Sequence, residues 1–291
     1  RLKTAYDSNP GGWLGSAILA LRPTENAEFL LAGNYRDFGN YTTGNGTEIE
    51  TETKAPSGLA KGTFRFGEGN EQALRVSYQH WTTSGDDQPY AQVTTTPDFG
   101  TIDRKVTDKT AIIAYENPAS DNEWLNFKAQ LSYSDTVNEQ SDASGVGSTL
   151  FNDATYAYQT WQFNAQNTFD HSGDGWENHL TFGLQAARQT RSVETASAYG
   201  FHPQGVDSRI GLFVQNEFIW NEKLTIIPGI RVDFKSMEPD ATVPGASGSD
   251  ATGISPKLAA HYKFNENFAV FGSYAHTERL PTLDEIFSDD F

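Results

Sequence analysis

Apolar and polar residues alternate along most of this chain, and this period of two constrains its fold more than any other feature of the sequence. Between residues 125 and 134 every odd position is Leu, Phe, Ala, Leu or Tyr, and every even position is polar. Between residues 224 and 234 the even positions are Leu, Ile, Pro, Ile, Val and Phe. Successive side chains of a β-strand point to opposite faces of a sheet, whereas an amphipathic helix repeats its apolar residues three and four apart. No window fits the helical spacing better, so the sequence predicts an all-β chain.

The connections between the predicted strands alternate between short and long from Pro23 onward. The short connections are polar turns near residues 23–26, 67–70, 117–122, 170–175, 221–222 and 265–267. The long connections are rich in Gly, Ser, Thr and acidic residues and cover about 39–55, 84–99, 137–153, 194–207 and 237–253. Successive connections of an up-and-down sheet fall on opposite rims, so the short turns share one rim and the long loops share the other. Bacterial outer-membrane barrels have this layout, with periplasmic turns and extracellular loops.

The length of the chain indicates how many strands it can form. At roughly 22 residues per strand and connection, the 291 residues give about 13 strands, most of them about ten residues or longer. Soluble sandwiches usually have shorter strands. Single-chain bacterial barrels usually have an even number of strands, and unpaired edge strands invite aggregation. We therefore expect residues 1–291 to be one partial domain of an antiparallel up-and-down transmembrane β-barrel, with flanking strands outside this sequence.

Aromatic residues gather beside the short connections. The sequence has Phe or Trp next to five of these turns, at Phe64, Phe66, Trp124, Phe169, Trp176, Phe218, Trp220, Phe264 and Phe268. Amphipathic rings at one rim are typical of the interfacial girdle of a membrane barrel. The alternative is that aromatic residues are simply common in strands.

Composition excludes several classes of function. The net charge is −17 and there are no cysteines. Binding to a phosphate backbone needs clustered Lys and Arg, so nucleic acid is not an expected partner. The missing cysteines exclude disulfides, thiolate metal sites and cysteine nucleophiles. Nothing resembles a nucleophile elbow or a phosphate loop, so we predict no catalytic residue, no metal site and no enzymatic activity.

Three stretches in the second half of the chain resemble TonB-dependent outer-membrane receptors. Residues 227–233 are similar to the family's Pro-Gly-aliphatic-Arg-aromatic-Asp strand. Residues 255–258 match the Ser-Pro-Lys that begins the family's next strand. Residues 274–287 resemble the family's barrel box, a Phe-Arg-Ala-Pro-Thr sequence followed by a spacer, Glu and an apolar-aromatic pair. The four residues that match this box are Arg279, Pro281, Thr282 and Glu285.

Two positions depart from the family's box. Glu278 stands where the family has Phe, and Leu280 stands where it has Ala.

The first half of the chain resembles one branch of the family, the receptors for haem, haemoglobin, transferrin and lactoferrin. The resemblance lies in the order of the stretches 8–13, 34–41, 57–61, 74–80 and 115–126. It implies energy-coupled uptake across the bacterial outer membrane, through a 22-stranded barrel that an N-terminal plug closes. It also implies contact with outer-membrane lipid and with the TonB energy-coupling complex. The plug and the coupling box are expected outside this sequence.

His202 is the candidate haem ligand that the residues themselves suggest. It lies in a long, acidic loop and follows Tyr199 and Phe201, whose rings could pack on a porphyrin. Imidazole is a good axial ligand for haem iron. The alternative is an exposed loop histidine without a ligand. The resemblance places the family's haem histidines in the plug and in a later external loop, so it assigns no ligand in this chain.

Three hypotheses for function remain open at this stage. The first is a receptor that imports haem, or iron derived from a haemoprotein, with haem as the transported ligand. The second keeps the family and makes the cargo a ferric siderophore. The third is a soluble β-rich protein that binds carbohydrate. The long loops carry many acids and Lys54 as their single basic residue, which disfavours free anionic ligands and is compatible with a basic protein ligand.

Overall fold

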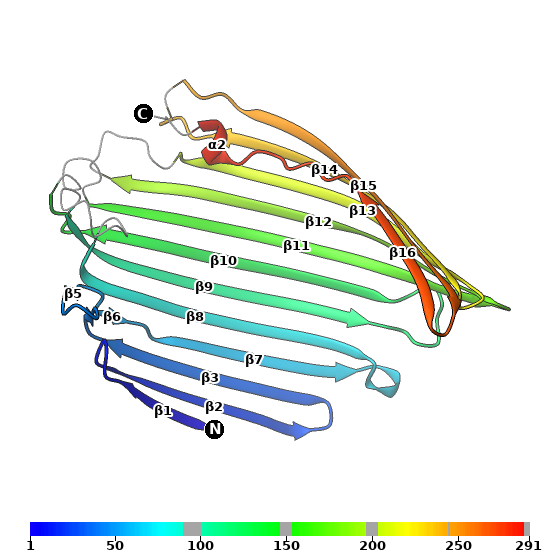
Figure 1. The fold of residues 1–291 in the computed structure, drawn as a ribbon, viewed down its shortest axis with the longest axis horizontal. Coiled ribbons are helices and arrows are strands. Elements are labelled where there is room, and N and C mark those ends of the chain that lie inside the picture. The colour runs from blue at the N-terminus through cyan, green and yellow to red at the C-terminus, as the bar shows by residue number, and fades with distance from the viewer. Residues whose placement is uncertain (90–99, 146–152, 196–202, 244, 288–291) are drawn as a thin grey trace.

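The computed structural model describes residues 1–89, 100–145, 153–195, 203–243 and 245–287 (Figure 1). Within them, antiparallel strands form one large sheet: β1 (Leu2–Asp7), β2 (Gly12–Thr24), β3 (Ala27–Phe38), β6 (Thr53–Lys54), β7 (Ser57–Phe66), β8 (Gln72–Pro89), β9 (Thr101–Asn117), β10 (Phe127–Ser141), β11 (Ala154–Gly173), β12 (Trp176–Thr195), β13 (Gly205–Trp220), β14 (Leu224–Pro239), β15 (Ser249–Asn265) and β16 (Phe268–Ala275). The smaller elements are the hairpin of β4 (Tyr41–Thr42) and β5 (Glu48–Ile49), the 3-10 turn η1 (Glu68–Asn70) and the helix α2 (Leu283–Phe287).

The sheet follows the order of the sequence. Neighbouring positions in the sheet are filled in the order of the chain, without a crossover. The short β6 and the longer β7 both lie between β3 and β8, so the 14 strands occupy 13 positions when β6 and β7 are counted as one interrupted strand. The predictions of an all-β, up-and-down sheet and of about 13 strands are therefore confirmed.

The strands extend further into the long connections than the sequence predicts. β8 continues to Pro89, β10 to Ser141 and β12 to Thr195, all inside segments that the sequence assigns to loops. Side chains on both faces of a strand are polar once it leaves an apolar environment, so the alternation fades there. The backbone hydrogen bonds continue regardless of side-chain polarity.

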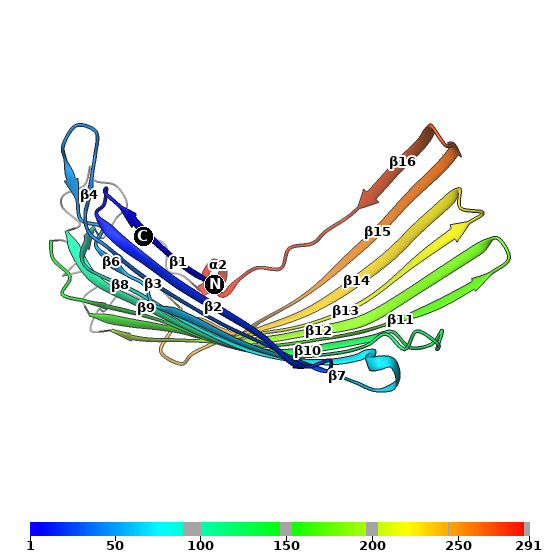
Figure 2. The same cartoon turned by 90° about the horizontal axis from the view of Figure 1, so that it is seen from below.

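The sheet is curved into a trough, and β1 and β16 form its two edges (Figure 2). The helix α2 lies inside the trough and packs against Met237 of β14. Met237 and Lys235 therefore point into the trough, and by strand alternation Phe234 and Ser236 point to its convex face. Register partners on adjacent strands lie on the same face, so the register assigns a face to the residues of the other strands.

Hydrophobic side chains cover the convex face. In one row of register partners, Phe163, Ala186, Ile210 and Phe234 lie side by side on β11 to β14. Phe163, Ile210 and Phe234 are exposed, as are Val76, Ile113 and Leu131 on the neighbouring strands. Exposed apolar rows on one face and a polar opposite face are typical of a wall that faces lipid. Within the described residues, no helix is long and apolar enough to cross a membrane.

Aromatic rings form contacts at the rim of the short turns, as the sequence predicts. Trp124 and Phe169 are 5.4 Å apart between ring centroids, and Phe264 and Phe268 are 5.3 Å apart. Trp220 is exposed at the same rim, at the end of β13.

Candidate functional site on the concave face

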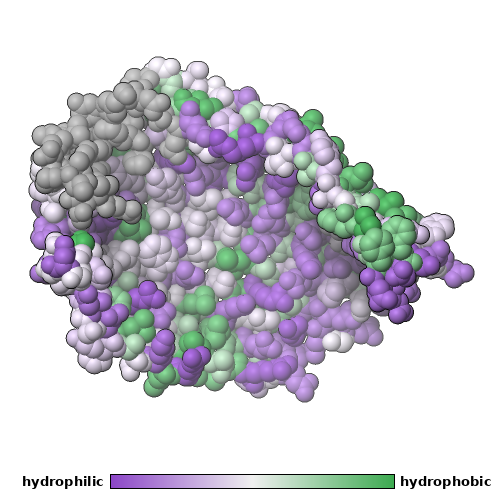
Figure 3. All heavy atoms as spheres, viewed as in Figure 1, coloured by the Kyte–Doolittle hydropathy of each residue, from purple (hydrophilic) through white to green (hydrophobic). Residues whose placement is uncertain are grey.

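The concave face of the trough is predominantly hydrophilic (Figure 3). Arg231 of β14 donates two hydrogen bonds to the carboxylate of Asp233, at 2.7 and 2.6 Å, and a third to Gln185 Oε1 on β12 at 2.7 Å. Arg75 on β8 pairs with Glu116 on β9 at 2.6 Å. Opposite charges within a strand and on neighbouring strands thus pair along the wall, so this polar face needs no packed core against it.

The chain after β16 turns back into the trough. Its short helix α2 packs Leu283 and Phe287 against Met237 of β14, and both Leu283 and Met237 are fully buried. This contact is the largest buried cluster in the described part of the chain, and it fixes residues 276–287 against the inner wall.

The four residues of the family box form one local structure. Thr282 directly precedes α2, and the carboxylate of Glu285 accepts hydrogen bonds from the Thr282 backbone N–H at 2.8 Å and from its hydroxyl at 3.2 Å. This is the glutamate half of a capping box, in which the third helical residue reaches back to the residue that begins the helix. Arg279 donates two hydrogen bonds to the same carboxylate, one of them at 3.0 Å. The Arg279 guanidinium and the Thr282 backbone N–H lower the pKa of the Glu285 carboxyl to about 2.

Pro281 connects this structure to the wall. The Lys235 ammonium on β14 donates to the Pro281 carbonyl at 2.5 Å and lies 2.8 Å from the Asp207 carboxylate on β13. Only 7% of the Lys235 side chain is exposed, so an unpaired ammonium here would be costly. The box is therefore bound to two strands through one buried cation.

The two departures from the family's box also contact the wall. Glu278 accepts a hydrogen bond from the Ile254 backbone N–H at 3.0 Å, and this bond, together with His276, lowers the pKa of its carboxyl. Leu280 lies over Gly253, where an added Cβ would be 3.2 Å from the Leu280 Cδ2 atom. Both substituted side chains thus hold the segment against β15, a role that the sequence does not reveal.

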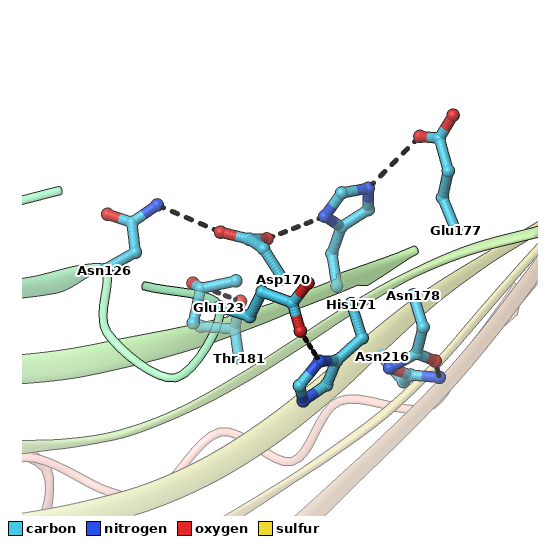
Figure 4. Close-up of polar contacts among 10 residues, drawn as sticks. Glu123, Asn126, Asp170, His171, Glu177, Asn178, Thr181 and Asn216 are labelled. Carbon is cyan, nitrogen blue, oxygen red and sulfur yellow. Dashed lines mark hydrogen bonds and ion pairs between the residues drawn. The ribbon is translucent and has the colours of Figure 1, made fainter. Parts of the chain in front are cut away.

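A second polar cluster lies at the rim of the short turns (Figure 4). His179 Nδ1 is 2.7 Å from Asp170, which also accepts a hydrogen bond from the Asn126 amide at 3.5 Å. His171 Nδ1 is 2.8 Å from Glu123. Because Asp170 faces His179 across the β11–β12 pair, His171 points to the opposite face of the sheet. The structure therefore separates these two histidines, which are close in sequence.

No metal site is found among the described residues: they contain no group of three or more His, Cys, Asp or Glu side chains that could hold a metal ion. His202, Tyr199 and Phe201, the predicted haem contacts, lie outside the described residues. The structure therefore brings together the residues of the family box and does not test the predicted ligand site.

Comparison with known proteins identifies the family. Residues 55–290 match the model of the TonB dependent receptor-like β-barrel, which is well over half of the chain. The hemin receptor of Yersinia enterocolitica is 25% identical over 287 residues, covering 94% of this chain and 38% of that protein. The TonB-dependent heme receptor A of Haemophilus influenzae (strain 86-028NP) is 25% identical, covering all of this chain and 45% of that protein. The chain thus spans less than half the length of these curated relatives.

Solved structures share the fold. A double mutant of the Serratia marcescens hemophore receptor HasR, in complex with its hemophore HasA and heme, has a TM-score of 0.79 at 23% identity and covers 97% of this chain and 45% of that chain. The copper transporter OprC has a TM-score of 0.76 at 15% identity, covering 98% and 45%. At these identities the likeness shows the fold alone. The family's members lie in the bacterial outer membrane, which confirms the predicted localisation and speaks against the soluble carbohydrate-binding alternative. The chain belongs to the TonB-dependent receptor β-barrel family.

Proposed function

We propose that the full-length protein that carries this chain takes up haem, or iron derived from a haemoprotein, across the outer membrane. The observation that carries the proposal is the similarity to two curated proteins named as a hemin receptor and a heme receptor, which extends over 94–100% of the chain. The hydrophilic concave wall is suited to line the path of a polar or charged cargo. The coupling partner in this proposal is the TonB complex.

Fold alone does not choose the cargo. The siderophore receptor PiuA of Acinetobacter baumannii has a TM-score of 0.70 at 14% identity, so a ferric siderophore is the second candidate. The curated relatives favour haem over this alternative, because their likeness in sequence is higher and both carry a haem name.

The test is a spectral titration of the full-length receptor with haemin. A saturable shift of the Soret band, and growth of a strain on haemin as its iron source that depends on the receptor, would support the proposal. Growth on a ferric siderophore without any Soret shift would contradict it and favour the second candidate. Loss of uptake on dissipation of the proton-motive force, with haemin binding unchanged, would support energy coupling.

We also propose His202 as an axial ligand, with Tyr199 and Phe201 beside the porphyrin. His202→Ala is expected to change the Soret position and weaken haemin binding. His80→Ala is the matched control. His80 alternates along β8 with the same phase as the exposed Val76 and Tyr78, so it lies on the convex face, away from the long loops. Equal spectra for the wild type and His202→Ala would contradict this ligand assignment and leave haem uptake as a separate question.

A further inference from the structure

The convex face contains an apolar hollow near its long-loop rim. Its volume is about 550 Å³, and its walls include Trp161 and Phe163 on one side and Ile210 and Phe234 on the other. Between these large side chains lies Ala186, which pairs with Phe163 on β11 and with Ile210 on β13. The hollow exists because a small residue on β12 lies between larger ones on both neighbouring strands.

A polar row borders this hollow on the side of the long loops. The row consists of register partners on β11 to β14: Trp161, Arg188, Ser208 and Ser236. It lies two residues along each strand from the Phe163–Phe234 row, and therefore on the same convex face. The convex face thus changes from apolar to polar at this row. Trp161 is half exposed there, a position typical of the boundary between hydrocarbon and headgroups.

Arg188 is a cation without a counterion in this row. It is exposed, and its side chain has no ion pair or hydrogen bond to any of the described residues. Asp250, the one carboxylate lining the hollow, follows Ser236 in the same row on β15. It is three strands from Arg188, or roughly 14 Å at the usual strand spacing of about 4.8 Å. The guanidinium and the hydroxyls of Ser208 and Ser236 are therefore free to bind an anionic group.

From this arrangement we propose that the hollow binds lipopolysaccharide, with a lipid A phosphate on Arg188, Ser208 and Ser236 and an acyl chain over Ala186. Guanidinium groups bind phosphate through paired hydrogen bonds, and a hydrocarbon chain fills the apolar part of the hollow. The long-loop rim is external in barrels of this kind. The external leaflet of the outer membrane consists of lipopolysaccharide, which matches an anionic headgroup above an apolar hollow. The inference does not depend on which cargo the receptor imports.

The experiment is a titration of the delipidated full-length receptor in detergent, followed by native mass spectrometry. The probes are bisphosphorylated lipid A, its dephosphorylated form and phosphatidylglycerol. The wild type is expected to bind bisphosphorylated lipid A most tightly. Arg188→Gln should weaken that binding about tenfold, as expected for the loss of a charge-assisted hydrogen bond, and leave the dephosphorylated form unaffected. Ala186→Phe, which fills the hollow without changing charge, should weaken the binding of both forms of lipid A.

The control is Lys109→Gln, which removes another exposed cation that lies outside the hollow, on β9. It should leave the binding of bisphosphorylated lipid A unchanged. Three results would overturn the proposal: equal loss in Lys109→Gln and Arg188→Gln, unchanged binding in Arg188→Gln, or equal affinity for phosphatidylglycerol and lipid A. Detergent-resistant, heat-modifiable migration of each variant would establish that it is folded.

Discussion

Truncation of Leu283 tests whether the segment after β16 is held in the trough by packing. Leu283 is fully buried against Met237 and Phe287. Leu→Ala substitutions at buried sites cost about 2–5 kcal/mol, and a cluster this small corresponds to the lower part, about 2–3 kcal/mol. At about 1.4 kcal/mol per factor of ten, the population of the undocked segment should rise roughly 30- to 150-fold in Leu283→Ala.

Limited trypsin cleavage after Arg279 in the full-length receptor measures this population. Cleavage follows the open fraction when the segment closes faster than the protease cuts, so its rate should rise by the same factor. Ile286→Ala is the matched control, because Ile286 lies on the same helix and is 38% exposed. Its rate should stay within a few-fold of the wild type. Equal rates for Leu283→Ala and Ile286→Ala would refute the docking argument.

Three further predictions follow from the same structure. The pKa of the Glu285 carboxyl is about 2, against an ordinary value of 4.5. The contribution of Glu285 to docking of the segment should therefore be complete above about pH 4.5 and be lost as the pH falls toward 2. Amide hydrogen exchange in α2 should show this pH dependence, and Glu285→Gln should abolish the dependence. Lys235→Ala leaves the carboxylate of Asp207 without its partner. It should raise the rate of amide exchange in α2 by a factor that corresponds to about 1–3 kcal/mol of docking free energy. The double variant Lys235→Ala, Asp207→Leu should recover part of this lost free energy. Leu212→Arg places a charge on the convex face, and near the bilayer midplane such a charge lowers the free energy of unfolding in lipid by about 2–4 kcal/mol. Gln130→Arg on the concave face should change the free energy of unfolding little in the same denaturant titration. Similar losses in the two variants would contradict the assignment of the faces.

The strand pattern could be predicted from the sequence because its cause is local. Alternation in 125–134 and 224–234 reports which face each side chain occupies, and the short turns report where each strand reverses. The ends of β8 and β12 could not be predicted in this way. Beyond the apolar band both faces are polar, so the backbone ladder continues with no change in the side-chain pattern to mark its end.

The family box was visible as a motif, but its physical role was not. Thr282 and Glu285 have the spacing of a capping box, and a reading of helix signals alone would have found it. The role of Pro281 depends on Lys235, which is 46 residues away in sequence and contacts it only in the folded sheet. The hollow beside Arg188 is equally hidden, because it depends on the register of four strands. Contacts of this kind are fixed by pairing between strands, and no single segment encodes them.

Contacts within the sheet position most of the polar side chains of the described concave wall. A packed core normally orients polar strands, but in the described residues the inner wall contacts another part of the chain chiefly through the docked segment at Met237. Elsewhere the polar side chains of the wall are positioned by contacts with other residues of the sheet. Arg231 donates two hydrogen bonds to Asp233 on its own strand and a third to Gln185, at distances of 2.6–2.7 Å, and the third bond crosses from β14 to β12 over the intervening β13. Because such bonds run along the face of the wall, they order its polar side chains without a packed core against them.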